Sequence, residues 1–257
     1  MQVFVLNLTK ANIRDAMKGQ AMIKRLLNIL VNLVILAAVI MLILLGVIGV
    51  RGFMLYKNRI EYKSLSAVAG EIRSEPLFTP IEELPDFYLK AVVATEDRDF
   101  YKHSGIKVTS MLRALIADVK AGAPVQGGST ITQQLAKNEL FTQEKTVDRK
   151  AAEIFAAFAL EREFTKNEIL ELYVNSIYFG DGYHGIGAAA EGLFGKTPSE
   201  LTRFECAELA GIPNAPSKYS VQFAPDEVEK RGEEVLKSML SAGSITESEY
   251  NEVLAEK

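Results

Sequence analysis

The chain of 257 residues contains one cysteine, two histidines and no tryptophan. Because Cys206 is alone, no disulfide can form within the chain, and the fold must depend on packing. With only His103 and His184 available, a dedicated zinc site is not expected either. The formal net charge of −4 provides no basic excess and disfavours a nucleic-acid-binding protein.

Charged side chains are also missing from residues 26–50, where only Asn28 and Asn32 interrupt the apolar run. A helix of this length rises about 37 Å, enough to cross a hydrocarbon core of ~30 Å. The run is longer than the apolar core of a cleaved signal peptide, which has about 7–15 residues. We therefore expect an uncleaved membrane anchor, which excludes a fully soluble cytoplasmic enzyme. No second run of this length occurs, which excludes a polytopic transporter.

The charges around this run indicate its orientation. Residues 1–25 carry five basic side chains and one acidic one, so they have a net charge of +4 and the remainder of the chain has −8. Basic residues also follow the run, but the short basic flank favours an N-terminus in the cytoplasm. Residues 51–257 would then lie on the extracytoplasmic side.

From Leu84 onward the sequence patterns are helical, and the predicted fold class is all-α. Three helix starts have the spacing of a capping box, in which a Thr and a Glu three residues later bond to each other's backbone. These boxes are Thr165–Glu168, Thr197–Glu200 and Thr246–Glu249. No strand alternation and no internal repeat are visible.

The expected organisation has five parts. They are a basic cytoplasmic N-terminus (1–25), the transmembrane helix (26–50), a membrane-proximal connector with short extended pieces (51–83), a helical domain (84–220) and a C-terminal helical extension at the periphery (221–257).

Glu96 is the first candidate for chemistry. It ends an apolar helical pattern and should lie at the edge of the core, where loss of solvation raises the pKa of a carboxyl and suits it to proton transfer. The alternative is a capped or solvated glutamate on the surface.

Two further stretches attract attention. Gly127-Gly128-Ser129-Thr130 can open a helix whose free N–H groups face an anion, with Lys137 about two turns farther on. The alternative is an ordinary loop before a helix. Glu153 stands among apolar residues, where a charge is costly unless it has a partner. Its alternative is a buried ion pair with a structural arginine.

Taken together, four stretches resemble the peptidoglycan glycosyltransferase family (glycosyltransferase family 51), lysozyme-like enzymes that polymerise lipid II into glycan strands. The resemblance runs from about Pro85 to Ser220, in the family's order and spacing. The stretches are Glu96–Gly105, Gly127–Asn138, Arg149–Glu153 with Glu171–Gly180, and Gly185–Ala190 with Phe194–Lys196 and Ala210–Ser217. The resemblance implies a lysozyme-like glycosyltransferase domain behind a single N-terminal transmembrane helix.

The resemblance also implies roles for single residues. Glu96 matches the catalytic base. Glu153 matches a second essential carboxylate, which assists at the part of the active site that binds the diphosphate and the metal. The positions that match the donor site near the diphosphate are Arg113, Ser129, Gln134 and Lys137. Lys145 falls where relatives often have arginine, so a bidentate phosphate contact would become a point-charge contact. His184 and Leu193 stand where the family is often aromatic, which puts substrate contacts in doubt but not the activity.

The same resemblance predicts a divalent metal, Mg²⁺ or Mn²⁺, and no organic cofactor. The expected partners are lipid II, the growing glycan strand, the lipid bilayer and other cell-wall synthases, with no nucleic acid. The chain is similar to the monofunctional, single-pass form in the cytoplasmic (inner) membrane. Residues 221–250 resemble the linker of bifunctional relatives, so a fragment of a longer parent is an alternative. Two other functions stay open at this point: a non-catalytic scaffold of the wall-synthesis machinery and a lytic glycosidase.

Several other patterns are judged to be misleading. Ser104-x-x-Lys107 matches the start of a transpeptidase motif, but its partner motifs are missing. Gly195-Lys196-Thr197 lacks the first glycine of a P-loop. Cys206 is expected to be a core residue, and His103 to orient the first motif. Residues 106–123 are expected to form a mobile amphipathic flap on the membrane, with an ordinary core helix as the alternative.

Overall fold

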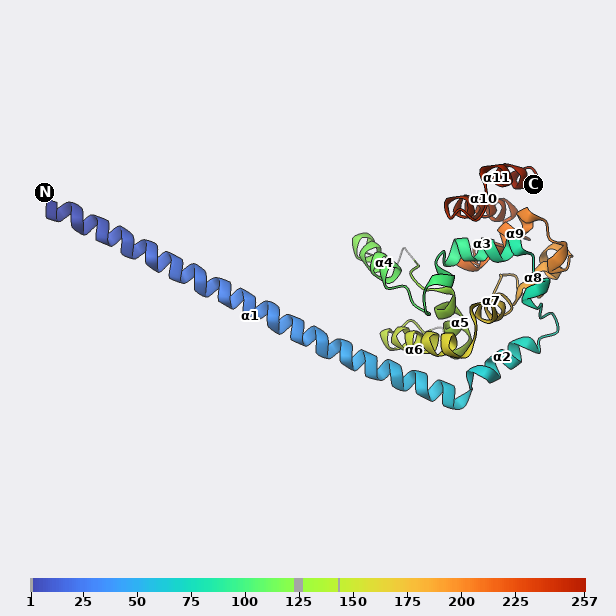
Figure 1. Cartoon of the computed structure of the whole chain (residues 1–257), viewed down its shortest axis with the longest axis horizontal. Helices are drawn as coiled ribbons and strands as arrows, with labels where there is room; N and C mark the ends of the chain where they lie inside the picture. The colour runs from blue at the N-terminus through green and yellow to red at the C-terminus, as the bar shows by residue number, and fades with distance from the viewer. Residues whose placement is uncertain (1, 123–126, 143) are drawn as a thin grey trace. The chain divides into compact units, whose positions relative to one another are not determined.

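The protein is all-α, as the sequence predicts (Figure 1). The computed structural model describes the backbone of residues 2–122, 127–142 and 144–257. No β-strand occurs in those ranges, and Tyr178 and His184 form an isolated bridge. The helices are α1 (Gln2–Tyr62), α2 (Leu65–Arg73), η1 (Ile81–Glu83), α3 (Asp86–Glu96), η2 (Phe100–Lys102), α4 (Val108–Ala121), α5 (Ile131–Leu140), α6 (Val147–Glu163), α7 (Lys166–Val174), α8 (Ile186–Phe194), η3 (Pro198–Glu200), α9 (Arg203–Gly211), η4 (Ile212–Asn214), α10 (Pro225–Ser241) and α11 (Glu247–Leu254).

Residues 1–50 and 51–257 are two separate compact units. In the first, α1 contains a candidate membrane span that starts at Lys24 and whose most apolar window has a mean hydropathy of 3.2. The helix does not end where the apolar run ends at Val50 but continues to Tyr62, and the candidate span is counted to the same residue. By length and composition, it can therefore cross a membrane.

The expected connector at 51–83 is more helical than predicted. Its first residues continue α1, and Ser64 then caps α2 by accepting a hydrogen bond from the backbone N–H of Ala67 at 3.1 Å. The short stretch 78–80, just before η1, belongs to no helix or turn. The amide of Asn175 holds this stretch, because it exchanges two bonds of 2.9 Å with the backbone of Thr79.

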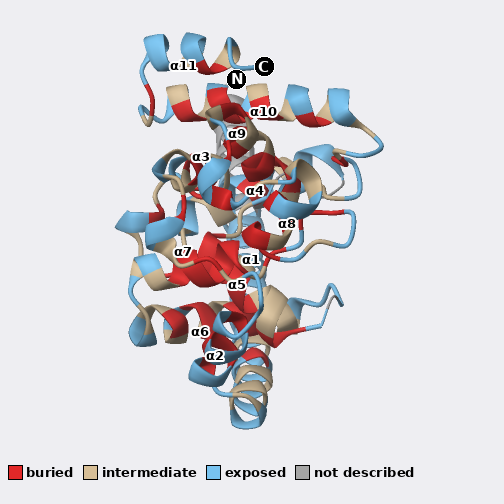
Figure 2. Cartoon of the chain, turned by 90° about the vertical axis from the view of Figure 1, so that its right-hand side faces the viewer, coloured by how far each residue is buried: buried red, intermediate tan, exposed pale blue. Residues whose placement is uncertain are grey.

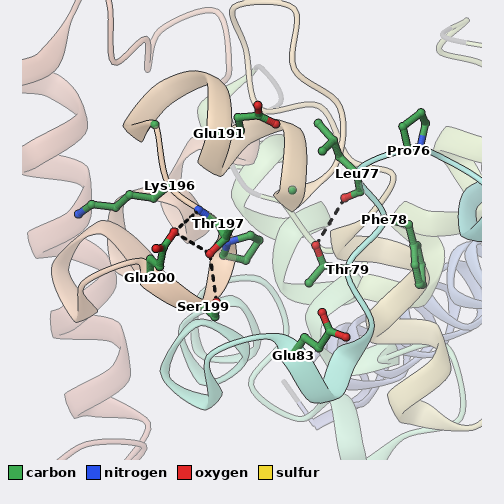
Figure 3. Close-up of a pocket in the computed structure, with 13 residues that line it drawn as sticks. Pro76, Leu77, Phe78, Thr79, Glu83, Glu191, Lys196, Thr197, Ser199 and Glu200 are labelled. Carbon is green, nitrogen blue, oxygen red and sulfur yellow. Dashed lines mark hydrogen bonds between the residues drawn. The ribbon is translucent and has the colours of Figure 1, made fainter.

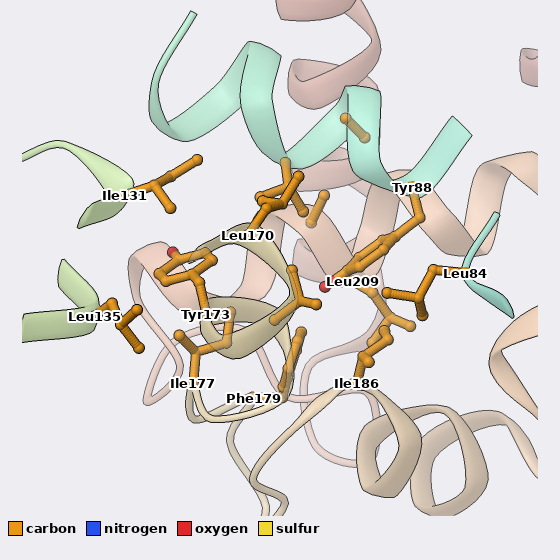
Figure 4. Close-up of a cluster of buried hydrophobic side chains, with 14 of the residues drawn as sticks. Leu84, Tyr88, Ile131, Leu135, Leu170, Tyr173, Ile177, Phe179, Ile186 and Leu209 are labelled. Carbon is orange, nitrogen blue, oxygen red and sulfur yellow. The ribbon is translucent and has the colours of Figure 1, made fainter. Parts of the chain in front are cut away.

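The core of the second unit lies where α3, α5, α7, α8 and α9 meet (Figure 4). Figure 2 shows its buried residues gathered around α5 and α7, whereas α11 is largely exposed on the outside. The largest fully buried side chains include Tyr88 of α3 and Tyr173 of α7. This packing fixes the C-terminal end of α3 against the N-terminal end of α5, where the candidate residues lie.

All three predicted capping boxes are confirmed, at Thr165, Thr197 and Thr246. Two more boxes start α5 and α9, with Thr130 and Thr202 as the capping residues. Their partners, Gln133 and Glu205, stand at the same three-residue spacing, so the same sequence pattern marks these two helix starts.

The C-terminal extension is not peripheral throughout. Helix α10 packs against α3 and α9 and buries the apolar side chains Val228, Val235, Leu236 and Met239. The high charge of this segment favoured a peripheral position, but the charged residues occupy one side of α10 and the apolar residues the other.

The predicted flap is a helix, α4, whose apolar residues Val108, Leu112 and Ile116 are exposed, while Ala114 is buried. Those exposed side chains are unlike those of an ordinary core helix. The side chains of Leu115 and Val119, and residue 123, lie outside the described part of the chain. Contact with a membrane stays a prediction.

Candidate active site

Glu96 is the last residue of α3, at the edge of the core where the sequence places it. Its Oε2 accepts a hydrogen bond from Nε2 of Gln134 at 2.8 Å. Its Oε1 is shielded from solvent and has no hydrogen-bond partner among the described residues. Burial raises the pKa of this carboxyl, against the opposing effects of the Gln134 bond and the positive charges of Arg231 and Lys137. A carboxyl with a raised pKa and a free oxygen can exchange a proton with a bound molecule.

A cleft of about 380 Å³ brings Glu96 together with two of the predicted donor-site residues, Arg113 and Ser129. Arg113 projects from α4 and is exposed, and Ser129 lies just before α5. Lys107 also lines this cleft, although its amine pairs with Asp99. The cleft thus combines the carboxyls of Glu96 and Asp97 with basic side chains and the glycines Gly127 and Gly128.

Glu153 lies on α6 and is 1 % exposed. Its Oε2 is 2.8 Å from Nζ of Lys150, and its Oε1 is 3.0 Å from Nη1 of Arg149, although the latter pair lacks hydrogen-bond geometry. The same Lys150 amine bonds Ser129 Oγ at 2.8 Å. The predicted alternative of a buried ion pair therefore describes Glu153 correctly, and this ion pair is linked to the cleft through Lys150.

Lys137 is half-buried on α5, and burial lowers the pKa of its amine. The negative charge of Glu153 acts most strongly against that effect, and Glu96 acts in the same direction. Arg149 and Lys150 add positive charge nearby and lower the pKa further. Lys137 is therefore a cation in the electrostatic reach of both candidate carboxylates.

The structure does not bring Lys145 into this group. Its side chain is exposed in the segment before α6, and it is not among the residues that line the cleft. A placement of Lys145 at a phosphate thus remains a prediction from the resemblance alone.

Two residues of the site escaped the sequence reasoning. Lys150 stands three residues before Glu153, a spacing that brings two side chains together on a helix, but only the fold shows its bond to Ser129. Arg231 comes from α10 and lowers the pKa of Glu96. Its Nε donates to the backbone oxygen of Gly211 at 3.2 Å, which fixes the side chain. No local sequence signal links residues so far apart in the chain.

His103 has the orienting position that the sequence predicts. Its Nε2 lies 2.8 Å from Oδ2 of Asp97, and the same oxygen accepts a bond of 3.3 Å from the backbone N–H of Ile131. Asp97 thus ties the end of α3 to the start of α5. Because Glu96 and Gln134 lie on these two ends, the network holds their side chains in reach of each other.

The misleading patterns are resolved by their contacts. Lys107 pairs with Asp99, and Lys196 pairs with Glu205 at 2.6 Å. Cys206 is buried, and burial raises the pKa of its thiol to about 12, so it is an unreactive core residue.

A second cleft of about 470 Å³ lies between the stretch before η1 and the segment from α8 to η3 (Figure 3). Two of its polar side chains, Thr197 and Glu200, form a capping box with each other. None of the predicted site residues lines this cleft. It is therefore not the place where the candidate residues gather.

The predicted metal has little protein support at the site. The described residues contain no group of three His, Cys, Asp or Glu side chains that could hold an ion. Both oxygens of Glu153 face the cations Arg149 and Lys150. Protein ligands in the described ranges therefore do not form a Mg²⁺ site by themselves, because Mg²⁺ requires oxygen ligands in near-octahedral geometry.

The chain matches known proteins over the part that carries this site. The family model described as Transglycosylase matches residues 63–240, which extends past both ends of the expected domain at 84–220. Penicillin-binding protein 1A of Aquifex aeolicus is 46% identical over 177 residues, covering 69% of this chain and 24% of the relative. Penicillin-binding protein 1A/1B of Bacillus subtilis is 44% identical over 190 residues, covering 74% of this chain and 20% of the relative.

A third relative, penicillin-binding protein 1A of Escherichia coli, is 42% identical over 192 residues, covering 75% of this chain and 22% of the relative. The chain thus spans less than a quarter of the length of these relatives. A crystal structure of penicillin-binding protein 1A from Haemophilus influenzae has a TM-score of 0.41 and 24% identity, covering 70% of this chain and 17% of that one. On the extent of the family match and these identities, the chain belongs to the transglycosylase family.

Proposed function

We propose that this chain polymerises lipid II into linear glycan strands of peptidoglycan, for the synthesis of the bacterial cell wall. The family membership supports transfer of a peptidoglycan glycosyl group. The single observation that carries the proposal is the Glu96 carboxyl beside a cleft with basic side chains: its pKa is raised, and one of its oxygens has no hydrogen-bond partner among the described residues. A diphosphate-linked sugar needs both features: a base for the acceptor and positive charge for the leaving group.

In the proposed reaction, Glu96 takes the proton from the 4-hydroxyl of the acceptor sugar. The freed oxygen attacks the anomeric carbon of the growing chain and forms the new glycosidic bond. The bond between that carbon and the diphosphate oxygen breaks with its electron pair, and polyprenyl diphosphate leaves with inversion of configuration. Gln134, which donates to the other oxygen of Glu96, would keep the base oriented during this step.

The leaving diphosphate requires positive charge more than a strong acid. Arg113 lines the cleft and Lys137 is half-buried near both carboxylates, so both are proposed to contact the donor's diphosphate. Ser129 would bind there with its neighbouring glycines. Glu153 would act by keeping Arg149 and Lys150 in place, since these are its ion-pair partners.

The long apolar helix supports the location that we propose. The substrate carries a polyprenyl chain, which stays in the bilayer, so an enzyme that uses it must work at the membrane surface. A single span in the cytoplasmic membrane would hold residues 51–257 there, on the extracytoplasmic side. Partnership with other cell-wall synthases is part of the same proposal.

The experiment is to incubate the purified full-length chain with lipid II in liposomes and to separate the products by size. We expect a ladder of glycan polymers. The absence of any reaction would indicate a non-catalytic scaffold, and shortening of added glycan strands would indicate a lytic glycosidase. Either of these two results would contradict the proposal.

A further inference from the structure

Three side chains from three helices form a hydrogen-bonded line that ends at Glu96. Tyr173 of α7 has a fully buried side chain, and its hydroxyl donates to Oε1 of Gln134 at 3.2 Å. Gln134 of α5 in turn donates from Nε2 to Oε2 of Glu96 at 2.8 Å. The tyrosine ring lies beside Ile131 and Leu135 in the core (Figure 4), so it has no freedom to move away from α5.

The direction of this line follows from the chemistry of its ends. Burial raises the pKa of the Tyr173 phenol well above its usual value, so the hydroxyl keeps its proton and can donate. A glutamine amide has one end that accepts and one that donates. When its oxygen accepts from Tyr173, its NH₂ group must point to the carboxylate.

We propose that Tyr173 is a positioning residue that fixes the amide orientation of Gln134 and thereby keeps an N–H donor on Glu96. The inference rests on the proposed role of Glu96 as the base. Tyr173 touches no reacting atom, and its whole effect passes through Gln134.

Loss of the Tyr173 hydroxyl has a specific consequence. The Gln134 amide can then turn over and present its oxygen to Glu96. Two acceptors in contact favour a protonated carboxyl, because only a proton between them makes a hydrogen bond. A protonated Glu96 cannot serve as a base, so activity at low pH suffers most.

The test is Tyr173→Phe, which removes one oxygen atom and keeps the buried ring. Tyr88→Phe is a matched control, because Tyr88 of α3 is equally buried and its hydroxyl has no hydrogen-bond partner among the described residues. We expect the acidic limb of kcat/KM against pH to move upward by about one unit in Tyr173→Phe, the effect of one hydrogen bond to a charged group. The limb should stay in place in Tyr88→Phe.

A double-mutant cycle shows whether Tyr173 acts through Gln134. Gln134→Leu should move the same limb upward, and adding Tyr173→Phe to it should move the limb no further. If Tyr173→Phe folds poorly, Gln134→Leu alone still tests the proposal, because it changes a partly exposed side chain and an unmoved limb in that variant would overturn the proposal. Additive shifts would overturn the proposal.

The readout must also separate this proposal from the proposed function. If the wild-type chain makes no polymer, the proposed function is contradicted. A carbon-13 NMR titration of the Glu96 carboxyl in the full-length protein still tests whether Tyr173 acts on Glu96 through Gln134. We expect a higher pKa for Glu96 in Tyr173→Phe than in the wild type and in Tyr88→Phe. An unchanged titration, an unchanged acidic limb, or a loss of activity with no change in pH profile would overturn the positioning role.

Discussion

At the scale of single residues, the two candidate carboxylates have opposite surroundings. Glu153 faces a cation with each oxygen, at 3.0 and 2.8 Å, and belongs to an ion-pair cluster with Arg149 and Lys150. Glu96 has one amide donor, its other oxygen has no partner in the described part of the chain, and burial raises its pKa. Carboxylates whose environments differ in this way take different roles in catalysis. Glu96 fits proton transfer, and Glu153 fits the support of positive charge.

Glu96→Gln should make the protein more stable at neutral pH. The folded state raises the pKa of Glu96 above its unfolded value, so this group favours folding at low pH and that contribution is lost as the pH rises through the folded pKa. Glutamine carries no charge at any pH. The midpoint of thermal unfolding should therefore increase relative to the wild type above the folded pKa, and the difference should vanish near pH 4 and below.

Glu75→Gln is a suitable control for this measurement, since Glu75 is exposed. Its melting temperature should follow the wild type at every pH. A Glu96→Gln variant that is less stable than the wild type at pH 8 would show that the charged carboxylate stabilises the fold, contrary to our account.

Lys137→Ala should reduce polymerisation far more than Lys145→Ala. Lys137 is half-buried near both carboxylates, and loss of a preorganised charge at a leaving group typically costs ~10²-fold in rate. Lys145 is exposed, and exposed charges contribute ~0–1 kcal/mol, so the loss there should stay below about fivefold. Initial rates of polymerisation with lipid II measure the loss in each of the two variants. A sharp loss in Lys145→Arg would show that Lys145 does not meet a phosphate.

At the scale of helices, the sequence predicted the features that depend only on residues close together along the chain, such as where a helix begins or ends. The capping box at Thr165 needs only its own helix start, and the position of Glu96 at the end of α3 follows from an apolar pattern. The sequence could not predict contacts that depend on packing. The bond from Lys150 to Ser129 joins two segments, and Arg231 reaches the site only because α10 packs on α3.

Gly187 in α8 should not tolerate even a methyl group. A Cβ at this position would lie 2.0 Å from the backbone oxygen of Leu77, so α8 or the stretch before η1 would have to shift. We expect Gly187→Ala to destabilise the protein by about 1–3 kcal/mol, as overpacking typically does. Chemical denaturation of residues 51–257 measures the change.

Gly70→Ala is the matched control, because Gly70 also lies within a helix but has nothing near its Cβ position. This change should stabilise the protein by up to about 1 kcal/mol, the usual helix preference for alanine over glycine. Equal effects of the two substitutions would contradict the close contact at Gly187.

At the scale of the whole chain, the segment that follows the apolar run is packed onto the helix that carries Glu153. Arg51 pairs with Asp148 at 2.8 Å, and the rings of Phe53 and Phe155 lie 5.4 Å apart in an edge-to-face contact. Gly52 allows a close approach to Ala151 of α6. These contacts all belong to residues 51–257. The sequence predicted a membrane anchor but not this attachment, because nothing in the apolar pattern indicates a partner helix.

Deletion of residues 1–50 should therefore leave a folded protein that works poorly when lipid II is sparse. The contacts with α6 described above start at Arg51, so they survive the deletion. Without the anchor, the enzyme must find its substrate from solution instead of along a surface with a high effective concentration. Exposed apolar residues of α4 should retain some membrane affinity, so the loss should be partial.

Rates of both forms in liposomes across a range of lipid II densities measure this effect. The difference should widen as the density falls. Equal rates at every density would show that the helix only localises the protein.

The most direct test of the central claim, that Glu96 is the base of a lipid II polymerase, is the polymerisation rate of Glu96→Gln beside wild type and Glu75→Gln. Glutamine keeps the size of the side chain but cannot take the proton, and loss of a general base typically costs ~10²–10⁴ in rate. We predict a loss in that range for Glu96→Gln, with an unchanged circular dichroism spectrum, and full activity for Glu75→Gln. A folded Glu96→Gln that retains more than half of the wild-type rate would contradict the account.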